Sequence, residues 1–154
     1  MIKLKKILGI LFACLFLTGC NQKETKLDFT TIKNELNALT VNEETIFTSL
    51  KEYSEEDLKN IYSIDSSLAD EMHFMQSEDT NNASMYIIAL PKKGKEKEIQ
   101  DQINTFFESF QLQADMYNPE NAVLIKNRME TKVGNYLIYI VSSNNNKVLE
   151  IIKK

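Results

Sequence analysis

The sequence contains few of the residues that most often carry chemistry. Its only histidine is His73, and its two cysteines, Cys14 and Cys20, both lie among the first 20 of 154 residues. Its four glycines are scattered, so no glycine-rich phosphate-binding loop is present. Zinc needs about four ligands drawn from His, Cys, Asp or Glu, and a histidine-supported triad needs a nucleophile beside the base. We therefore expect no cofactor and no metal site, and we expect His73 to be a strand histidine with structural hydrogen bonds.

The N-terminus has the composition of a secretory signal. Lys3, Lys5 and Lys6 precede residues 7–17, a stretch of 11 residues without a charge. At about 1.5 Å per residue, a helix of this length crosses only about half of a hydrocarbon core that is roughly 30 Å thick. The pattern predicts a signal peptide and not a membrane-spanning helix.

The apolar stretch ends in a motif that resembles the lipobox of bacterial lipoproteins, namely Leu17, Thr18, Gly19 and Cys20. Small residues at 18 and 19 let a membrane-embedded peptidase close around the backbone, while the thiol of Cys20 is alkylated with diacylglycerol before cleavage. Two acyl chains hold a protein on a membrane, whereas one chain binds only marginally. The alternative is an ordinary secretory signal that a cysteine follows by chance. We expect a signal peptide over residues 1–19, a lipidated tether over 20–26 and one domain over 27–154.

This interpretation predicts a location on the extracytoplasmic face of the cell membrane, with the lipid on Cys20 as the membrane contact. Cys14 leaves with the signal peptide and Cys20 is consumed as a thioether, so no disulfide is expected and the core must stabilise the domain alone. About six flexible tether residues span at most about 20 Å. The domain would therefore reach only the layer next to the bilayer.

The charge of the expected mature chain is acidic. Three of the 18 basic residues lie in the signal, which leaves 15 against 22 acidic residues and a formal charge of −7. Nucleic acid is excluded as an expected partner because phosphate binding needs a dense basic patch. An acidic domain is also mildly repelled by anionic lipid. The lysines of residues 92–97 are interpreted as a solvated approach to a helix and not as a basic recognition patch. A protein partner should be neutral or basic where it makes contact.

Hydrophobic spacing predicts mainly helices in the first half of the domain. Residues 27–39 have apolar positions at helical spacing, with Asp28 placed to cap the start. Ile46, Phe47 and Leu50 suggest a second short turn or helix. Residues 54–57 resemble the start of a further helix, with Asp57 in the fourth position of a capping box. Their acidic side chains are better explained by a helix start than by a metal site.

The second half of the domain predicts strands around one long helix. Alternation over residues 72–74 and the apolar run 85–90 indicate two strands joined by a polar turn. A stripe from Ile99 to Tyr117 predicts the long helix, which Asn118 and Pro119 should end. Two further strands are expected at about 123–131 and 136–142, followed by a closing helix near 148–152. The second of these strands is apolar on both faces and should be central.

Together these elements predict an α+β, two-layer domain. An antiparallel sheet of about four strands should pack on the long helix, with further helices at the N-terminus. Phe106 and Phe110 are expected to point into the core against the strand that contains Leu137 and Val141.

Several short segments then resemble a known family. These are residues 58–64, the sequence Tyr117-Asn118-Pro119-Glu120, and residues 134–137 after a lipobox and a leading helix. The chain is similar, over roughly residues 27–153, to the Gram-positive lipoprotein family built on domain of unknown function 4358. The resemblance implies a small α+β lipoprotein domain without established activity or catalytic residues. Ser63 stands where the family usually has a glycine.

The expected role is noncatalytic. We expect a module that binds a protein, peptide or envelope component at the membrane surface. The alternative is a small hydrolase of envelope glycan or peptide, since a glycosidase needs only two carboxylates at a suitable separation. Tyr117, Asn118 and Pro119 form a candidate binding edge, although a proline that simply ends a helix explains the same residues.

Overall fold

The computed structural model describes residues 25–154, and the expected signal peptide and Cys20 lie outside this range. The fold is α+β, as expected. Five antiparallel strands form the main sheet in the order β3-β4-β5-β7-β6. They are β3 (Leu50–Glu52), β4 (Ala69–Ser77), β5 (Met85–Pro91), β6 (Met129–Val133) and β7 (Tyr136–Val141). The sheet has one strand more than predicted, because the short polar strand β3 adds to the edge of β4.

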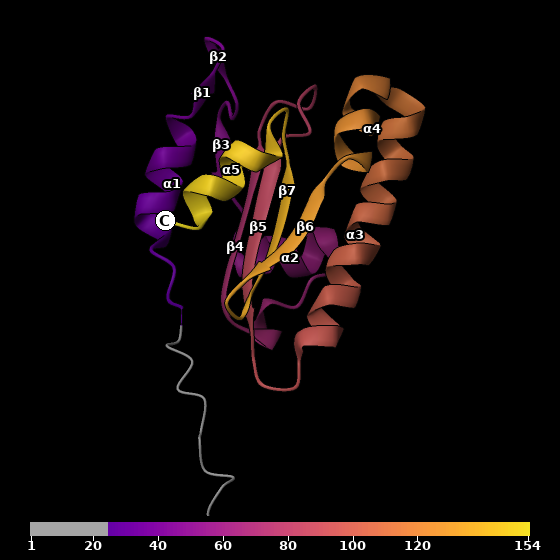
Figure 1. Ribbon diagram of the computed structural model, residues 1–154. Coiled ribbons are helices and arrows are strands. Elements are labelled where there is room, and N and C mark those ends of the chain that lie inside the picture. The colour runs from indigo at the N-terminus through magenta and orange to yellow at the C-terminus, as the bar shows by residue number, and fades with distance from the viewer. Residues whose placement is uncertain (1–24) are drawn as a thin grey trace, which may run out of the picture.

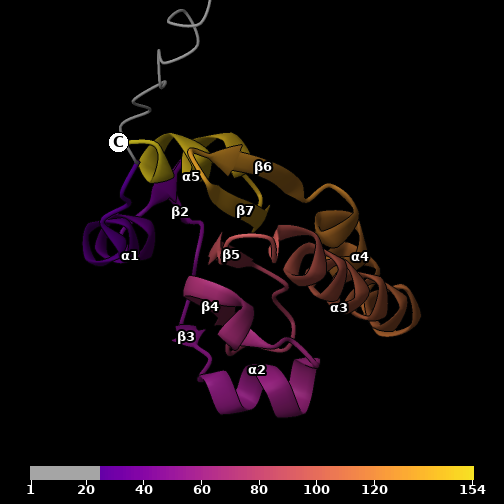
Figure 2. The same cartoon turned by 90° about the horizontal axis from the view of Figure 1, so that it is seen from below.

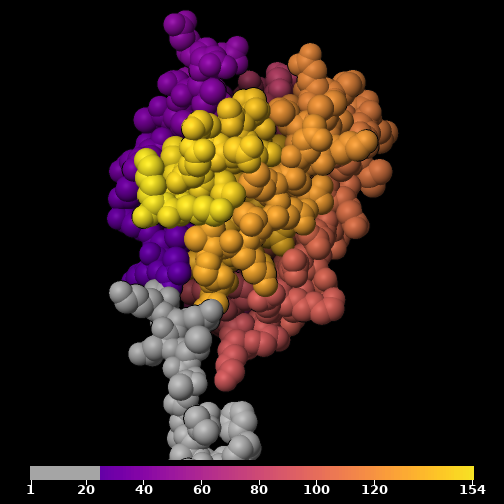
Figure 3. All heavy atoms as spheres, in the orientation of Figure 1, coloured from indigo at the N-terminus to yellow at the C-terminus, as the bar shows by residue number. Residues whose placement is uncertain are grey.

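Helices cover both faces of the sheet (Figures 1 and 2), which makes three layers where two were expected. One face carries α2 (Glu55–Tyr62), the long α3 (Glu96–Tyr117) and α4 (Pro119–Lys126). The other carries α1 (Phe29–Asn37) and α5 (Asn145–Ile152), which lie side by side in Figure 3. Alternate residues of β5 and β7 face the two layers, so all six residues of β7 are buried. β7 is an interior strand as predicted, although β5 occupies the middle position.

The long helix α3 lies on the sheet through the predicted stripe. Ile99, Ile103 and Phe106 are buried, which confirms the orientation of the helix. The packing of its phenylalanines differs from the expectation. Phe107, which was not among the predicted contacts, packs on β7 with its ring centre 5.8 Å from that of Tyr139.

Phe106 and Phe110, the two phenylalanines that were predicted to face β7, pack differently from Phe107. Phe106 packs 5.2 Å from Phe74 of β4, and Phe110 is only half-buried. The stripe gave the correct face of the helix, but the adjacent side chains of Phe106 and Phe107 pack against different strands, β4 and β7.

The predicted strand at 123–131 is wrong over its first half. Asn118 ends α3 and also begins α4, because its side-chain oxygen accepts a hydrogen bond from the Asn121 backbone at 3.1 Å. Pro119 occupies the first turn of α4, where its missing N–H costs nothing. Helix start signals therefore outweigh the β propensity of Val123 and Ile125, and only β6 remains from the predicted strand.

The segment expected as a short turn or helix around Ile46 and Phe47 is not helical. A two-stranded sheet of β1 (Thr40–Val41) and β2 (Glu44–Thr45) precedes it. The turn between these strands places Asn42 and Glu43 at φ 52° and 69°. Ile46 and Phe47 are buried and pack below α1 in an irregular stretch that leads into β3.

The remaining helices agree with the predictions. Asp28 caps α1 through the Thr31 backbone at 3.1 Å. Ser54 and Asp57 form both halves of a capping box at the start of α2. Ser63 ends α2 at φ 57°, a left-handed conformation that favours glycine. That conformation explains why a glycine suits this position.

The described chain enters the fold at one end of the sheet. Thr25 packs against Gly134 so closely that a Cβ placed on Gly134 would lie 2.7 Å from the Cβ of Thr25. The same end holds Ala69 and Pro91, which pair across β4 and β5, whereas Ser77 and Met85 lie at the opposite end. Within residues 25–154, no helix combines the length and hydropathy needed to cross a bilayer.

Candidate functional site

A groove runs between α2 and α3 on one face of the sheet. We call it the α2–α3 groove. The section beside the β4–β5 loop, of about 290 Å³, is lined by 15 residues, and we call it the wide end. An adjoining section of about 340 Å³ toward the middle of α3 is lined by eight. Tyr62, Phe110 and Gln113 line both sections, so the two are continuous.

Aromatic rings form the floor of the groove. Tyr62 contacts Tyr53 and Phe106 edge to face, each at 5.2 Å between ring centres, and Phe106 stacks on Phe110 at 5.5 Å. Burial raises the pKa of the Tyr62 hydroxyl, and neighbouring Tyr53 adds to this effect. The hydroxyl therefore stays protonated, and it donates a hydrogen bond to Gln76 at 3.1 Å. The floor is mostly apolar.

The wide end of the groove brings together polar side chains from segments far apart in the sequence. Glu78 and Asp79 come from the β4–β5 loop, Tyr117 ends α3, and Asn118 and Asn121 belong to the start of α4. Tyr117 is 77 % exposed. Two of the residues predicted as a binding edge, Tyr117 and Asn118, thus line the groove, while Pro119 is outside its lining.

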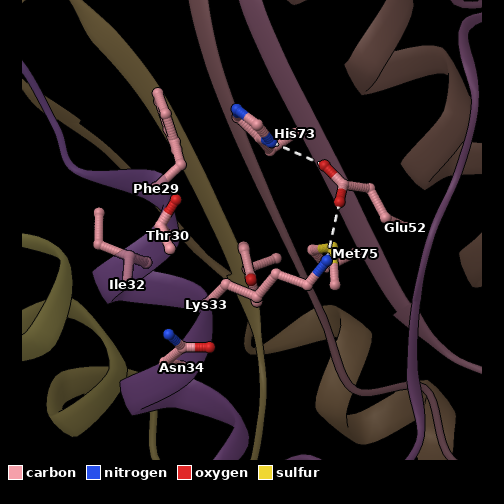
Figure 4. Close-up of a pocket in the computed structure, with 9 residues that line it drawn as sticks. Phe29, Thr30, Ile32, Lys33, Asn34, Glu52, His73 and Met75 are labelled. Carbon is pink, nitrogen blue, oxygen red and sulfur yellow. Dashed lines mark hydrogen bonds and ion pairs between the residues drawn. The ribbon is translucent and has the colours of Figure 1, made fainter.

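A second hollow, of about 400 Å³, lies on the opposite face between α1 and the edge of the sheet (Figure 4). Glu52 of β3 lines it and contacts two of its other residues. One carboxylate oxygen accepts a hydrogen bond from Nδ1 of His73 at 2.8 Å, and the other pairs with Nζ of Lys33 at 3.0 Å. Phe29 stacks on the His73 ring at 3.9 Å between ring centres.

The electrostatics of this hollow follow from those contacts. Burial opposes ionisation of Glu52, but the hydrogen bonds from His73 and Lys33 outweigh it and hold the carboxyl pKa below its ordinary value. Glu52 is therefore ionised at neutral pH and pairs with both His73 and Lys33. His73 has the structural hydrogen bond that was expected of it.

The Glu52 and His73 pair resembles two members of a catalytic triad. A carboxylate that orients a histidine is two-thirds of a triad, and the third member is a nucleophile at the other ring nitrogen. Thr30 lines the same hollow, yet the described residues show no hydrogen bond between Thr30 and His73. Within residues 25–154 no three His, Cys, Asp or Glu side chains are grouped to hold a metal ion.

Sequence reasoning missed most of the α2–α3 groove. Tyr53, Tyr62 and Phe110 look like ordinary core positions in the sequence, and Glu78 and Asp79 look like turn residues. Only the contacts between α2, α3 and the β4–β5 loop bring them together. Glu52 was missed because β3 is too short and polar to be recognised as a strand.

Comparison with known proteins gives one match. The family model described as Domain of unknown function (DUF4358) matches residues 43–142. The match begins in the β1–β2 turn and ends just after β7, so it contains the whole main sheet and the α2–α3 groove, whereas Phe29 and Lys33 of the other hollow precede it. No curated protein and no solved structure matches the chain. Since the match covers most of the sequence, the chain belongs to the family of this domain of unknown function, DUF4358.

Proposed function

We propose that this protein is an extracytoplasmic lipoprotein of the Gram-positive type, anchored through Cys20, whose domain binds an envelope or membrane protein partner without chemically changing it. The anchor rests on the positive N-terminus, the 11-residue apolar stretch and the lipobox Leu17, Thr18, Gly19 and Cys20. Diacylglycerol on Cys20 supplies the membrane contact.

The α2–α3 groove is the observation that carries the binding role. Binding sites combine an apolar, aromatic lining with a few placed polar groups, and this groove has both in its two sections. The described residues that line it include no histidine, cysteine, lysine or arginine. The hydroxyls of Thr105 and Ser109 bond to carbonyls of their own helix, so neither is an activated nucleophile.

The position of the groove supports presentation to a partner. The described chain begins at the Gly134 end of the sheet, while Asp79 and Asn82 of the groove lie at the Ser77 end. Strands of seven to nine residues separate the two ends by about 20 to 30 Å. An anchor attached ahead of Thr25 would therefore leave the wide end of the groove facing away from the bilayer.

A second candidate function has one specific observation in its favour. His73 and Glu52, 2.8 Å apart in an open hollow, have the geometry of a general base and its orienting carboxylate. This supports the alternative of a small envelope hydrolase acting on glycan or peptide. Purified protein that hydrolyses an envelope polymer, and loses that activity in His73→Ala and in Glu52→Gln, would establish this alternative.

Photo-crosslinking in intact cells tests the binding role. A photoreactive amino acid at Gln113, in the shared part of the groove, should capture a discrete partner. The same amino acid at the exposed Asn146 of α5, on the other face, is the matched control and should not capture it.

The anchor contributes to this result through effective concentration. A secreted form, made by replacing the signal and Cys20, should capture the partner far less efficiently than the anchored form. Equal crosslinking from Gln113 and Asn146 would show that the groove is not the binding site. Equal capture by the anchored and secreted forms would show that the anchor does not contribute to partner binding.

A further inference from the structure

The charged side chains of the α2–α3 groove have one sign. Glu78 and Asp79 are the only charged residues among the described residues that line either section, and both lie at the wide end. Asp79 accepts a hydrogen bond from the Asn81 backbone through Oδ1 at 2.9 Å, which fixes the position of its carboxylate. The wide end therefore has a fixed negative charge with no cation on the lining to neutralise it.

Aromatic faces beside this charge favour a cation further. Tyr117, which is 77 % exposed, lines the same end beside Tyr53 and Tyr62, and an exposed aromatic face attracts ammonium and guanidinium groups. The protein itself provides an example, because Nζ of Lys51 lies 5.1 Å from the centre of the Tyr53 ring at the edge of this cluster.

The other section of the groove has a different chemistry. Phe106 and Phe110 form its floor and Ile61, which is 61 % exposed, forms its rim. The hydroxyls of Thr105 and Ser109 already bond within α3. This section is suited to an apolar side chain because its floor is aromatic and these two hydroxyls already have partners.

The distance between the two sections sets the size of the ligand. Phe106 and Tyr117 are 11 residues apart on α3, which corresponds to about 16 Å at about 1.5 Å per residue. An extended peptide advances about 3.3 Å per residue, so about five residues cover this distance.

We infer that the α2–α3 groove binds an extended peptide segment with an apolar side chain in the Phe106 and Ile61 section and a lysine or arginine four to five residues away, at Glu78 and Asp79. This inference rests on the proposed binding function and names its ligand class. A neutral glycan fits less well, because it has no cation to pair with Glu78 and Asp79.

The test is a peptide array probed with the full chain in detergent. Each peptide has a glycine and serine backbone with one leucine and one lysine, spaced two to eight residues apart. Binding should peak at a spacing of four or five. It should fall at least tenfold when glutamine replaces the lysine or serine replaces the leucine, and it should weaken as salt is raised.

Variants of the protein assign the binding to the groove. The double substitution Glu78→Gln and Asp79→Asn keeps the shape and the Asn81 hydrogen bond, and it should abolish the preference for lysine over glutamine. Tyr117→Ala should weaken binding of the lysine peptide. Glu108→Gln removes an exposed acid of α3 outside the groove and should change nothing. Circular dichroism of each variant checks folding.

Several outcomes would overturn the inference. They are no binding peptide, equal binding of the lysine and glutamine peptides, an unchanged preference in the double variant, or binding of a neutral oligosaccharide in place of peptides. The peptide array measures binding in the groove and does not depend on the lipid anchor. A negative array result therefore says nothing about the anchor. If the array fails while crosslinking from Gln113 still captures a partner, the binding function stands and the ligand class is wrong.

Discussion

The side-chain oxygen of Asn121 accepts a hydrogen bond from the backbone N–H of Ala83 at 3.1 Å, which ties the start of α4 to the β4–β5 loop. Both residues are buried. They are 38 residues apart in the sequence, and this bond holds together the two segments that form the wide end of the α2–α3 groove.

Removing this hydrogen bond should destabilise the protein. Asn121→Ala leaves a buried N–H without a partner, which typically costs about 1 to 3 kcal/mol. We expect a lower urea midpoint with an unchanged dependence on urea concentration. Asn121→Asp is the matched control, because it retains an oxygen acceptor in the first turn of α4, where negative charge is favourable. Equal losses in both variants would show that the hydrogen bond is not the stabilising feature.

Two phenylalanines of α3 should differ in their contribution to stability. Phe107 is fully buried against Tyr139, and Phe107→Ala should lower the free energy of unfolding by about 3 to 5 kcal/mol. Phe110 is half-buried on the floor of the groove, so Phe110→Ala should cost clearly less. Denaturant unfolding of the two variants measures the difference. A larger loss for Phe110 would contradict the observed orientation of α3.

These contacts show what could be predicted from the sequence. Spacing along α3 identified its buried face, and the apolar run of β7 identified an interior strand, because both elements bury a regular pattern against a large surface. The individual partners of Phe106 and Phe107 could not be predicted. They depend on the angle at which α3 crosses the strands, and this angle is set by every side chain in the interface.

Local backbone conformations limited the prediction elsewhere. A hairpin turn such as Asn42-Glu43 is readily recognised when it contains glycine, but here Glu43 adopts positive φ without one. Helix α4 was not recognised in the sequence because Asn118-Pro119 was interpreted only as the end of α3. The same two residues also start α4. The groove could not be predicted because its lining joins three segments that have no common sequence pattern.

Ser63 offers a gain in stability. Its φ of 57° is strained for a residue with a side chain, by roughly 1 to 2 kcal/mol, and Ser63→Gly should relieve part of this cost. The greater flexibility of glycine in the unfolded chain offsets some of the gain. We expect a net increase in unfolding free energy of at most about 1 kcal/mol, measured as a higher melting temperature. Ser63→Val, with its branched side chain, should lower it.

Glu52 should make part of the stability depend on pH. Its folded-state pKa lies below the ordinary value of 4.5, so its ionised form stabilises the fold above that pH. The contribution is lost as pH falls through the folded-state pKa. Glu52→Gln should therefore be less stable than the natural protein at pH 7, by up to about 1 kcal/mol for so exposed a pair. The difference should shrink below pH 4.5, and a constant difference would exclude this explanation.

The anchor gives the last prediction, and mass spectrometry of the N-terminal peptide measures it. The mature chain should begin at Cys20 and carry diacylglycerol on the sulfur. Cys20→Ala should leave an uncleaved precursor that keeps residues 1–19, because cleavage requires the lipid-modified cysteine. Cys14→Ala is the matched control: it also removes a thiol near the N-terminus, but from the apolar stretch of the expected signal, and processing should continue. Detection of an unmodified Cys20, or of cleavage at another site, would contradict the proposed anchor, because the two acyl chains provide the membrane affinity.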